Sequence, residues 1–346
     1  MSMKWYDEAG TESSVVAASR IRLSRNLNAC CFPGKMSEQQ TKEMTDDLCR
    51  KLKRISRIDG RSYEDCRLDQ MDSMKREALE EKQIINGASV KDPKGAGLLV
   101  SGDEAVSITV NSVDHIRLQL SQSGMELQQI WAQIDKLDDC INEMYPYAYD
   151  ETLGYMTTYP TNLGTGMKAY LVLHLALLDS VDKFSDIVEE ISRYGVKLRP
   201  AFGKDKEISG SMYVLSNQKT LGISEQEIIQ VIEKVGSQLI SQEKSLRRHS
   251  VERHRIHAED ICLKAYGNLR YSRLMSLSSG MRLLSSLRWG QEEQVITFEK
   301  YCNIYELMIG IQPASLRVFY EKNLEGEAMD QARADYLQRF LPLLKQ

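Results

Sequence analysis

The stretch GLLVSGDEAVSITVNSVDHIRLQL, residues 97–120, alternates apolar and polar residues on both sides of the turn-forming triplet Ser101-Gly102-Asp103. Alternation of this kind is typical of β-strands, and the short turn between two such runs predicts a β-hairpin. The second run carries Asp114, His115 and Arg117, which packing alone does not require. Either these three side chains belong to an active site, or Asp114 and His115 form a buried structural pair and only Arg117 binds a ligand.

Outward from this hairpin, the pattern predicts more strands and several helices. Strands are expected at 195–202 (GVKLRPAF) and 211–218 (SMYVLSNQ). Helices are expected at 37–58, 73–85 and 124–144, at the apolar run 169–178 (AYLVLHLALL), and from Ser224, where Glu227 completes a capping box. We therefore expect an α+β fold, in which an antiparallel sheet is flanked by helices.

The strand pattern stops at about residue 235, and the rest of the chain has helical patterns. The sequence thus predicts a body over residues 1–245, with a mainly helical portion at 1–88, followed by a helical C-terminal domain over 246–346. The basic segment 50–61 has two interpretations, a solvated helix face or a binding patch for an acidic partner.

The composition excludes several classes of protein. The net charge is −4, which gives no argument for binding nucleic acid, and no apolar run is long enough to span a membrane. The seven cysteines form no C-x-x-C pair, so we expect neither a zinc site nor another structural metal. Because the first residues lack the apolar region of a signal peptide, we expect a cytoplasmic protein with reduced thiols.

Scattered arginines suggest an anion site. In ASRIRLSRN (18–26), Arg20 and Arg22 alternate with apolar residues, so on a strand they point to the same side. Arg117 and Arg199 occur on two other predicted strands. Guanidinium groups bind phosphate through a fixed fork of donors, although a salt-bridged surface edge is the simpler alternative for the first pair.

Three further segments carry polar residues, each with a structural alternative. The Gly/Thr-rich stretch 154–169 offers donors at Thr161, Asn162 and Thr165, but its spacing matches neither common phosphate-binding loop. The lysines of GKDKEISG (203–210) are either ligands or solubilising residues of a loop. The charges of 329–341 are either a site or ion pairs along a helix.

In this order, these segments resemble the ATP:guanido phosphotransferases, or phosphagen kinases, and most closely their bacterial branch, the protein arginine kinases. SRIRLSRN (19–26) is similar to the early arginine motif of that branch, and NSVDHIRLQ (111–119) to the family pattern N-E-E-D-H-x-R. GYMTTYPTNLGTGMKA (154–169) is similar to G-Y-L-T-S-C-P-T-N-x-G-T-G-x-R-A, and SNQKTLGISEQEII (216–229) also resembles the bacterial branch. The resemblance covers most of the chain.

The resemblance implies a site for ATP with Mg²⁺, in which arginines hold the phosphates while these are positioned and their charge is stabilised. Carried over by position, the nucleotide-binding residues are Ser19, Arg20, Ile21, Arg22, Leu23, Gln83, Arg117, Lys168, Ala169, Tyr170, Leu171, Val172 and Arg199.

The C-terminal domain of the family dimerises, and in the bacterial branch it carries a phosphoarginine receptor with the pattern R-D-x-x-R-A. Here Met329 replaces the first arginine, whereas Asp330, Arg333 and Ala334 match. The partners that the resemblance implies are a second copy of the chain, proteins with arginine or phosphoarginine, a zinc-binding activator protein, and a stress-response repressor or protease.

The chain departs from the family pattern at the catalytic carboxylates. Ser112 and Val113 stand where the motif has two glutamates, and alignment on Arg199 and Gly203 places Lys204 at the second catalytic glutamate. A guanidinium has a pKa above about 12 and must lose a proton to attack phosphorus. Val113 provides no base, Lys204 repels the cation, and loss of a general base typically costs about 10²–10⁴ in rate.

Smaller departures agree with these. Lys168 replaces a nucleotide-binding arginine and lacks its fork of donors. Gln83 replaces a histidine, Tyr159 a reactive cysteine and Pro200 a glycine.

The departures favour a non-catalytic regulatory paralogue that retains binding of a nucleotide or of phosphoarginine. The first alternative is an active protein arginine kinase whose carboxylates are relocated to Asp205 or Glu207. The second is a different reaction on the same scaffold, such as hydrolysis of phosphoarginine.

Overall fold

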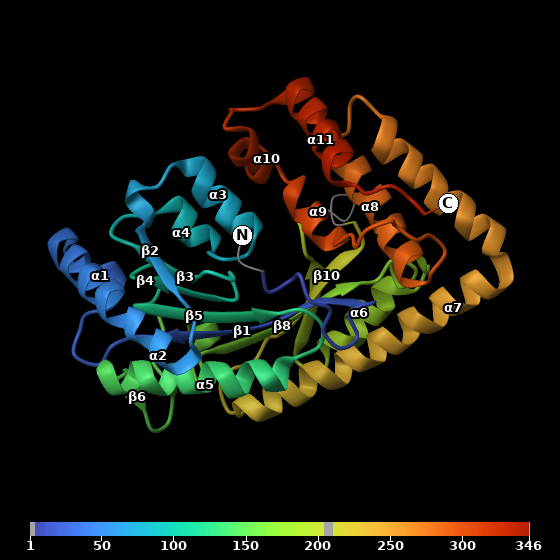
Figure 1. The fold of residues 1–346 in the computed structure, drawn as a ribbon. Coiled ribbons are helices and arrows are strands. Elements are labelled where there is room, and N and C mark those ends of the chain that lie inside the picture. The colour runs from blue at the N-terminus through green and yellow to red at the C-terminus, as the bar shows by residue number, and fades with distance from the viewer. Residues whose placement is uncertain (1–3, 204–209, 346) are drawn as a thin grey trace.

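In the computed structural model, which describes residues 4–203 and 210–345, the centre of the molecule is one antiparallel sheet (Figure 1). Its eight strands lie in the order β2-β3-β4-β5-β1-β8-β10-β9. These strands are β1 (Val16–Arg25), β2 (Tyr63–Arg67), β3 (Gly97–Ser101), β4 (Val106–Val110), β5 (Ile116–Gln122), β8 (Met167–His174), β9 (Val196–Pro200) and β10 (Met212–Asn217). β6 (Tyr149–Asp150) and β7 (Gly154–Tyr155) form a separate small hairpin. The predicted α+β class is confirmed.

Helices cover both faces of the sheet. In the body they are α1 (Glu38–Leu52), α2 (Ser56–Asp59), α3 (Ser73–Glu81), α4 (Gly87–Lys91), α5 (Leu127–Met144) and α6 (Phe184–Ser192). Those that follow are α7 (Glu225–Tyr271), α8 (Leu277–Glu292), α9 (Ile304–Gly310), α10 (Pro313–Tyr320) and α11 (Gly326–Phe340). None of the helices in the described part of the chain is both long and apolar enough to cross a membrane.

Two long helices, α5 and the first part of α7, run beneath one face of the sheet (Figure 1). Ile21 and Leu23 of β1 and Leu171 of β8 join the apolar core on this side, together with Ile130 of α5 and Ile232 of α7. The C-terminal helices α8, α9 and α11 form a second core against the other face, at the end of the sheet made by β8 and β10. Because side chains alternate along a strand, each central strand serves both layers.

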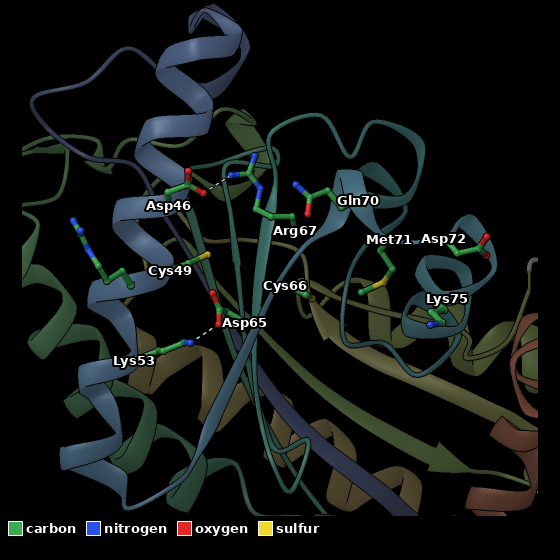
Figure 2. Close-up of a pocket in the computed structure, with 11 residues that line it drawn as sticks. Asp46, Cys49, Lys53, Asp65, Cys66, Arg67, Gln70, Met71, Asp72 and Lys75 are labelled. Atoms are coloured by element: carbon green, nitrogen blue, oxygen red, sulfur yellow. Dashed lines mark hydrogen bonds and ion pairs between the residues drawn. The ribbon is translucent and has the colours of Figure 1, made fainter.

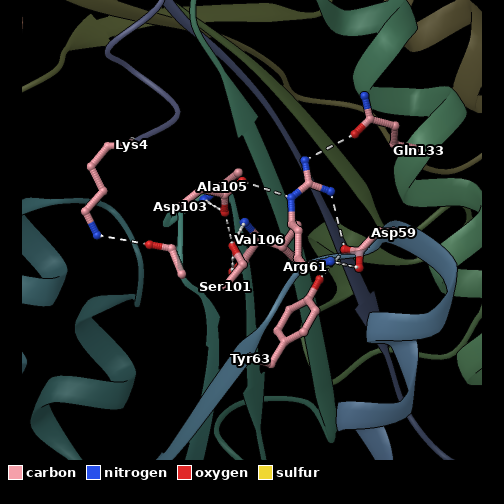
Figure 3. Close-up of polar contacts among 10 residues, drawn as sticks. Lys4, Asp59, Arg61, Tyr63, Ser101, Asp103, Ala105, Val106 and Gln133 are labelled. Carbon is pink, nitrogen blue, oxygen red and sulfur yellow. Dashed lines mark hydrogen bonds and ion pairs between the residues drawn. The ribbon is translucent and has the colours of Figure 1, made fainter. Parts of the chain in front are cut away.

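The predicted hairpin at 97–120 is confirmed by β3 and β4, and β5 adds a third antiparallel strand. Asp103 fixes the turn by accepting hydrogen bonds from the Ser101 hydroxyl and the Ala105 amide, the latter at 3.0 Å. Its other oxygen accepts from Arg61 Nε at 3.0 Å, which ties the turn to the segment before β2 (Figure 3). The turn therefore lies where the sequence predicted it, and Asp103 holds it to the neighbouring segment.

The helix predicted at 169–178 is wrong, because β8 covers most of this run. Ala169, Leu171 and Leu173 lie in the core above α5 and α7, whereas Tyr170 and Val172 face the other layer. A strand that is covered on both faces is apolar throughout, and such a run cannot be told from a buried helix by periodicity alone.

The other predicted elements agree with the structure. The strands at 195–202 and 211–218 are β9 and β10, and the helices at 37–58, 73–85 and 124–144 correspond to α1 with α2, α3, and α5. Ser224 and Glu227 form the predicted capping box. Residues 1–88 hold α1, α2, α3 and the first two residues of α4, and they also supply the central strand β1 and the edge strand β2. The predicted boundary at 245 falls within α7, which bends at His254, where φ is −136° and ψ is 42°.

Arg25, the last residue of β1, is buried and joins the sheet to α5. Its Nη2 and Nε donate to Asp138 Oδ2 at 2.7 and 3.0 Å, and its Nη1 donates to the carbonyl of Thr165 at 2.9 Å. Its guanidinium carbon lies 3.6 Å from the ring centre of Tyr155. These contacts of Arg25 thus hold the loop that precedes β8 in place.

Replacing Arg25 by methionine leaves the Asp138 carboxylate in the core without its cation. We expect Arg25→Met to lower the free energy of unfolding by about 3–5 kcal/mol, as when one partner of a buried ion pair is removed. Urea unfolding followed by circular dichroism measures this change. The variant Arg25→Met, Asp138→Leu removes both charges and should recover most of the loss. If the single and double variants were equally stable, the loss would be due to packing and not to the unpaired carboxylate.

Candidate functional site

Two adjoining cavities lie on the sheet face opposite α5 and α7. The first, the arginine cavity, has a volume of about 290 Å³ and is lined by Arg20, Arg22, Glu80, Gln83, Ile85, Asn86, Gly87, Arg117, Gln119, Tyr170, Val172, Arg199, Ala201, Phe202, Val214 and Tyr305. The second, the Val113 cavity, has a volume of about 260 Å³ and is lined by Arg22, Ser24, Asn86, Ser112, Val113, Asp114, Arg117, Tyr159, Thr161, Asn162 and Lys168. Arg22, Asn86 and Arg117 border both.

Strand register brings the arginines together. Arg22 of β1 pairs with Gln119 of β5 on one side and with Lys168 of β8 on the other. Arg117 is two residues from Gln119 and therefore points to the same face. Arg20 is two residues from Arg22 and donates from Nε to Ser121 Oγ at 2.9 Å. The alternation that places Ile21 and Leu23 in the core thus places the arginines in the cavity.

The guanidinium groups have hydrogen-bond donors to spare. Arg22 Nε, Arg117 Nε and Arg117 Nη1 are buried and have no hydrogen-bond partner among the described residues. Among the residues that the structure describes, no ion pair joins Arg20, Arg22 or Arg117 to a carboxylate. Burial lowers the pKa of Arg20, and burial with the nearby cation Arg22 lowers the pKa of Arg117 to about 9. Buried cations that repel one another and lack acceptors form a site that an anion would stabilise.

The Val113 cavity is also basic. Lys168 donates from Nζ to the carbonyls of Gln218 at 2.9 Å and Asn217 at 3.2 Å. Burial, followed by the charge of Arg22, lowers the pKa of Lys168 to about 8. The one carboxylate that the described residues contribute to the lining is Asp114, whose Oδ1 accepts from Asn26 Nδ2 and from the Thr158 amide, both at 2.8 Å. This carboxylate holds two loops together at the edge of the cavity.

His115 is structural, as one of the two interpretations from the sequence had it. It is fully buried; its Nδ1 accepts from the Leu27 amide at 3.1 Å, so Nε2 carries the proton and donates to the carbonyl of Cys31 at 3.1 Å. Burial lowers its pKa, and both ring nitrogens are engaged. It does not line either cavity.

The predicted nucleotide residues divide between the two faces of the sheet. Arg20, Arg22, Gln83, Arg117, Tyr170, Val172 and Arg199 line the arginine cavity, and Lys168 lines the Val113 cavity. Ser19, Ile21, Leu23, Ala169 and Leu171 lie on the opposite face and line neither. The hydroxyl of Ser19 instead donates to the carbonyl of Gly124 at 2.6 Å. Lys204, Asp205, Lys206 and Glu207 lie outside the described residues.

The glycines of the stretch 154–169 allow a tight turn and close packing against neighbouring parts of the chain. Gly164 and Gly166 have φ values of 97° and 63°, which favour glycine. A Cβ atom at Gly164 would lie 2.1 Å from the carbonyl oxygen of Thr220, and one at Gly166 would lie 2.6 Å from Arg25 Nη1. No helix follows, but Thr161 and Asn162 from this stretch do line the Val113 cavity.

Several lining residues were missed from the sequence. Glu80, Asn86 and Gly87 come from the end of α3 and the start of α4, and the Asn-Gly dipeptide was the only signal there. Tyr305 belongs to α9 in the C-terminal helices, and no local pattern associates it with the arginines. Its ring centre lies 6.4 Å from that of Phe202, which also lines the cavity.

The receptor-like residues of α11 are committed to internal contacts. Arg333 is buried and donates to the carbonyl of Met275 at 2.7 Å, to that of Ile311 at 3.0 Å, and to Asp330 at 2.6 Å. This is the ion pair along a helix that the sequence suggested, but its arginine is buried whereas Asp330 is partly exposed. It holds α11 to the start of α8 and to the end of α9.

A larger cavity, of about 640 Å³, lies between α1 and β2 (Figure 2). Its charged side chains pair with one another: Arg67 with Asp46 at 2.6 Å, and Lys53 with Asp65. Arg50 of the basic segment points to Asp47 on its own helix, at 2.7 Å. Since its charges are largely neutralised, this cavity is a weaker candidate for an anion site than the arginine cavity. The ion pairs also fit the interpretation of the segment 50–61 as a solvated helix face.

Comparison with known proteins agrees with this geometry. Residues 43–246 match the model of the ATP:guanido phosphotransferase C-terminal catalytic domain, and residues 255–346 match that of the protein-arginine kinase McsB C-terminal domain. A protein-arginine kinase of Caldanaerobacter subterraneus is 35% identical over 94% of this chain and 96% of its own length. Another, of Symbiobacterium thermophilum, is 34% identical over 96% of this chain and 94% of its own.

Solved structures show the same fold at lower identity. A duplicated taurocyamine kinase of Schistosoma mansoni superposes with a TM-score of 0.60 at 21% identity, over 70% of this chain and 35% of that one. A lombricine kinase gives 0.58 at 22% identity, over 72% of this chain and 70% of its own. By these matches along nearly its whole length, the chain belongs to the ATP:guanido phosphotransferase family, in its protein-arginine kinase branch.

Proposed function

We propose that this protein binds ATP with Mg²⁺ in the arginine cavity, has lost or nearly lost phosphoryl transfer to arginine, and acts as a regulatory paralogue of an active protein-arginine kinase. The observation that carries the proposal is the charge of the Val113 cavity. Among the described residues, its lining holds the cations Arg22, Arg117 and Lys168 and a single carboxylate, Asp114, which is engaged by the surrounding loops.

An arginine acceptor needs the opposite environment. Its guanidinium has to be oriented and deprotonated next to a phosphate, and this requires carboxylates close to the reacting nitrogen. Val113 and Ser112 provide neither a negative charge nor a strong base. Three cations in the lining also raise the cost of bringing a fourth into the cavity.

The arginine cavity, by contrast, suits a nucleoside triphosphate. The donors of Arg22 and Arg117 that lack partners can be satisfied by phosphate oxygens, and Tyr170, Phe202 and Tyr305 supply rings that a base can contact. No group of three or more metal-binding side chains occurs in the described ranges. Mg²⁺ would therefore be held mostly by the phosphates, with Glu80 as the carboxylate in the lining.

The C-terminal helices support the expected dimer. Beyond the bend in α7, Ile256, Leu263 and Tyr271 are 84%, 52% and 75% exposed. Residues seven and eight apart lie on the same side of a helix, so the three form one apolar stripe that a second copy can cover. By analogy with the family, the further partners are proteins with arginine or phosphoarginine, a zinc-binding activator, and a repressor or protease.

Removal of Arg117 tests nucleotide binding. We expect Arg117→Ala to weaken Mg-ATP binding by about tenfold or more, because a hydrogen bond to a charged group contributes about 1.5–3 kcal/mol. Isothermal titration calorimetry measures this, with Arg193→Ala, which changes an exposed arginine, as the matched control. AMP lacks the outer phosphates and should be affected less than ATP. An equal loss for both nucleotides would contradict a phosphate contact.

Phosphoryl transfer is tested by restoring the carboxylates. We expect no acid-labile transfer from γ-labelled ATP to an arginine-rich protein by the wild type, and measurable transfer by Val113→Glu, Lys204→Glu. The neutral isostere Val113→Gln, Lys204→Gln is the control and should stay inactive. Transfer by the wild type would instead establish an active protein arginine kinase, and Asp205 and Glu207 would then be the residues to replace.

The dimer is tested at the stripe on α7. We expect the wild type to sediment as a dimer and Leu263→Asp to sediment as a monomer, because an aspartate in the covered stripe would lose its water. Replacing the exposed neighbour Lys264 by alanine should leave the dimer unchanged. A monomeric wild type at micromolar concentration, or a dimeric Leu263→Asp, would rule out this interface.

A further inference from the structure

The helix α10 begins without a cap of its own. Gln312 precedes it and makes no capping hydrogen bond with its side chain, and Pro313 follows at the first helical position. The next two amides both donate to Glu81, the last residue of α3: Ala314 N to Oε1 at 2.8 Å, and Ser315 N to Oε2 at 2.7 Å. The hydroxyl of Ser315 donates to the same Oε2 at 2.8 Å. Glu81 therefore caps a helix of the other domain, a role in which a carboxylate also benefits from the helix dipole.

This contact is the polar centre of the packing between α3 and α10. The two helices lie against each other where the C-terminal helices meet the body (Figure 1). Around Glu81, burial raises the pKa of the carboxyl, while the hydrogen bonds from Ala314 and Ser315 oppose that rise. The start of α10 is itself held in place, since Arg333 donates to the carbonyl of Ile311 at 3.0 Å. Glu81 is thus fixed to a rigid support.

On both sides of Glu81, the chain forms a wall of the arginine cavity. Glu80 and Gln83 line the cavity, followed by Ile85, Asn86 and Gly87. Two residues after Glu81, the segment is held to the sheet, because Gln119 Nε2 donates to the carbonyl of Gln83 at 2.8 Å. Gln119 in turn accepts from Arg117 Nη2 at 3.4 Å.

The wall is attached on two sides. On the sheet side, besides the bond from Gln119, Ser107 Oγ of β4 donates to the carbonyl of Ile84 at 3.2 Å, and Lys82 lies 3.3 Å from Glu104. On the other side, Glu81 joins it to the C-terminal helices. Gln83 also has a φ of 62°, a left-handed conformation that costs energy in a residue other than glycine and persists only where neighbouring contacts enforce it. With Glu81 released, the segment keeps its attachments to the sheet but loses this link to α10.

We infer that Glu81 is a positioning residue for the nucleotide: by capping α10, its carboxylate holds the wall formed by residues 80–87 against the arginines. The inference rests on the proposed binding of ATP in this cavity. Glu81 does not line the cavity, so it acts through its neighbours Glu80 and Gln83.

The test uses the full chain and Mg-ATP as the probe. We expect Glu81→Ala to weaken ATP binding by about tenfold in calorimetric titration, which corresponds to about 1.4 kcal/mol. Glu81→Gln keeps the shape but retains one acceptor oxygen for two amides, so its loss should be smaller. The matched control is Glu77→Gln, one turn earlier on α3, which removes the carboxylate that lies 3.7 Å from Arg317 of α10. It should bind ATP like the wild type.

A second measurement separates positioning from stability. The unfolding midpoint of each variant without nucleotide reports the structural cost, and a double-mutant cycle with Ser315→Ala reports whether the two residues act as one contact. Weaker ATP binding by folded Glu81→Gln, with effects of Glu81→Ala and Ser315→Ala on affinity that are not additive, supports the inference. A lowered midpoint with unchanged affinity in both Glu81 variants overturns it. Wild-type protein that fails to bind ATP overturns the proposed function and the inference together.

Discussion

The alternation of side chains along β1 is the constraint on which the rest of the structure depends. This strand lies between β5 and β8 in the middle of the sheet. Ile21 and Leu23 point into the core above α5 and α7, and Arg20 and Arg22 point into the cavity on the other face. A shift of one residue in register would exchange the two sets, which would place the guanidinium groups in the apolar core and the apolar side chains in the cavity. Packing of the core therefore fixes the geometry of the arginine cavity.

The cavity keeps this geometry at an energetic cost. Arginine side chains that lie close together, lose their water and lack acceptors destabilise the folded chain, and the lowered pKa of Arg117 reflects that cost. The fold tolerates them because the apolar face of the same strands is extensively buried. An anion that satisfies the free donors would relieve the cost, so the same feature that weakens the empty protein favours binding. The proposed loss of catalysis concerns the neighbouring Val113 cavity and leaves this arrangement unchanged.

Both layers of the molecule contribute to the cavity. Tyr305 reaches it from α9, and Glu81 joins the segment that lines it to α10. A second polar cluster binds the layers at the far end of β8, where Arg247 of α7 donates to Glu243 at 2.7 Å and to His174 Nδ1 at 3.0 Å. Ser285 of α8 lies 2.8 Å from His174 Nε2. The C-terminal helices are thus part of the structure that shapes the cavity, although sequence analysis had assigned them only dimerisation and a receptor.

Four features could be predicted from the sequence alone: the α+β class, the hairpin at 97–120, the capping box at Ser224, and the alternation that directs Arg20 and Arg22 to one side. These features depend on contacts between near neighbours, which local patterns encode. Only the tertiary structure decided that the apolar run of β8 is a strand, because its two faces are covered by helices distant in sequence. The assembled structure also decided that Leu171 faces away from the arginines, that Arg333 is held inside the C-terminal helices, and that Tyr305 and Glu81 belong to the site. Contacts across more than a hundred residues have no signature in any single stretch of chain, so their chemistry could be seen only once the layers were assembled.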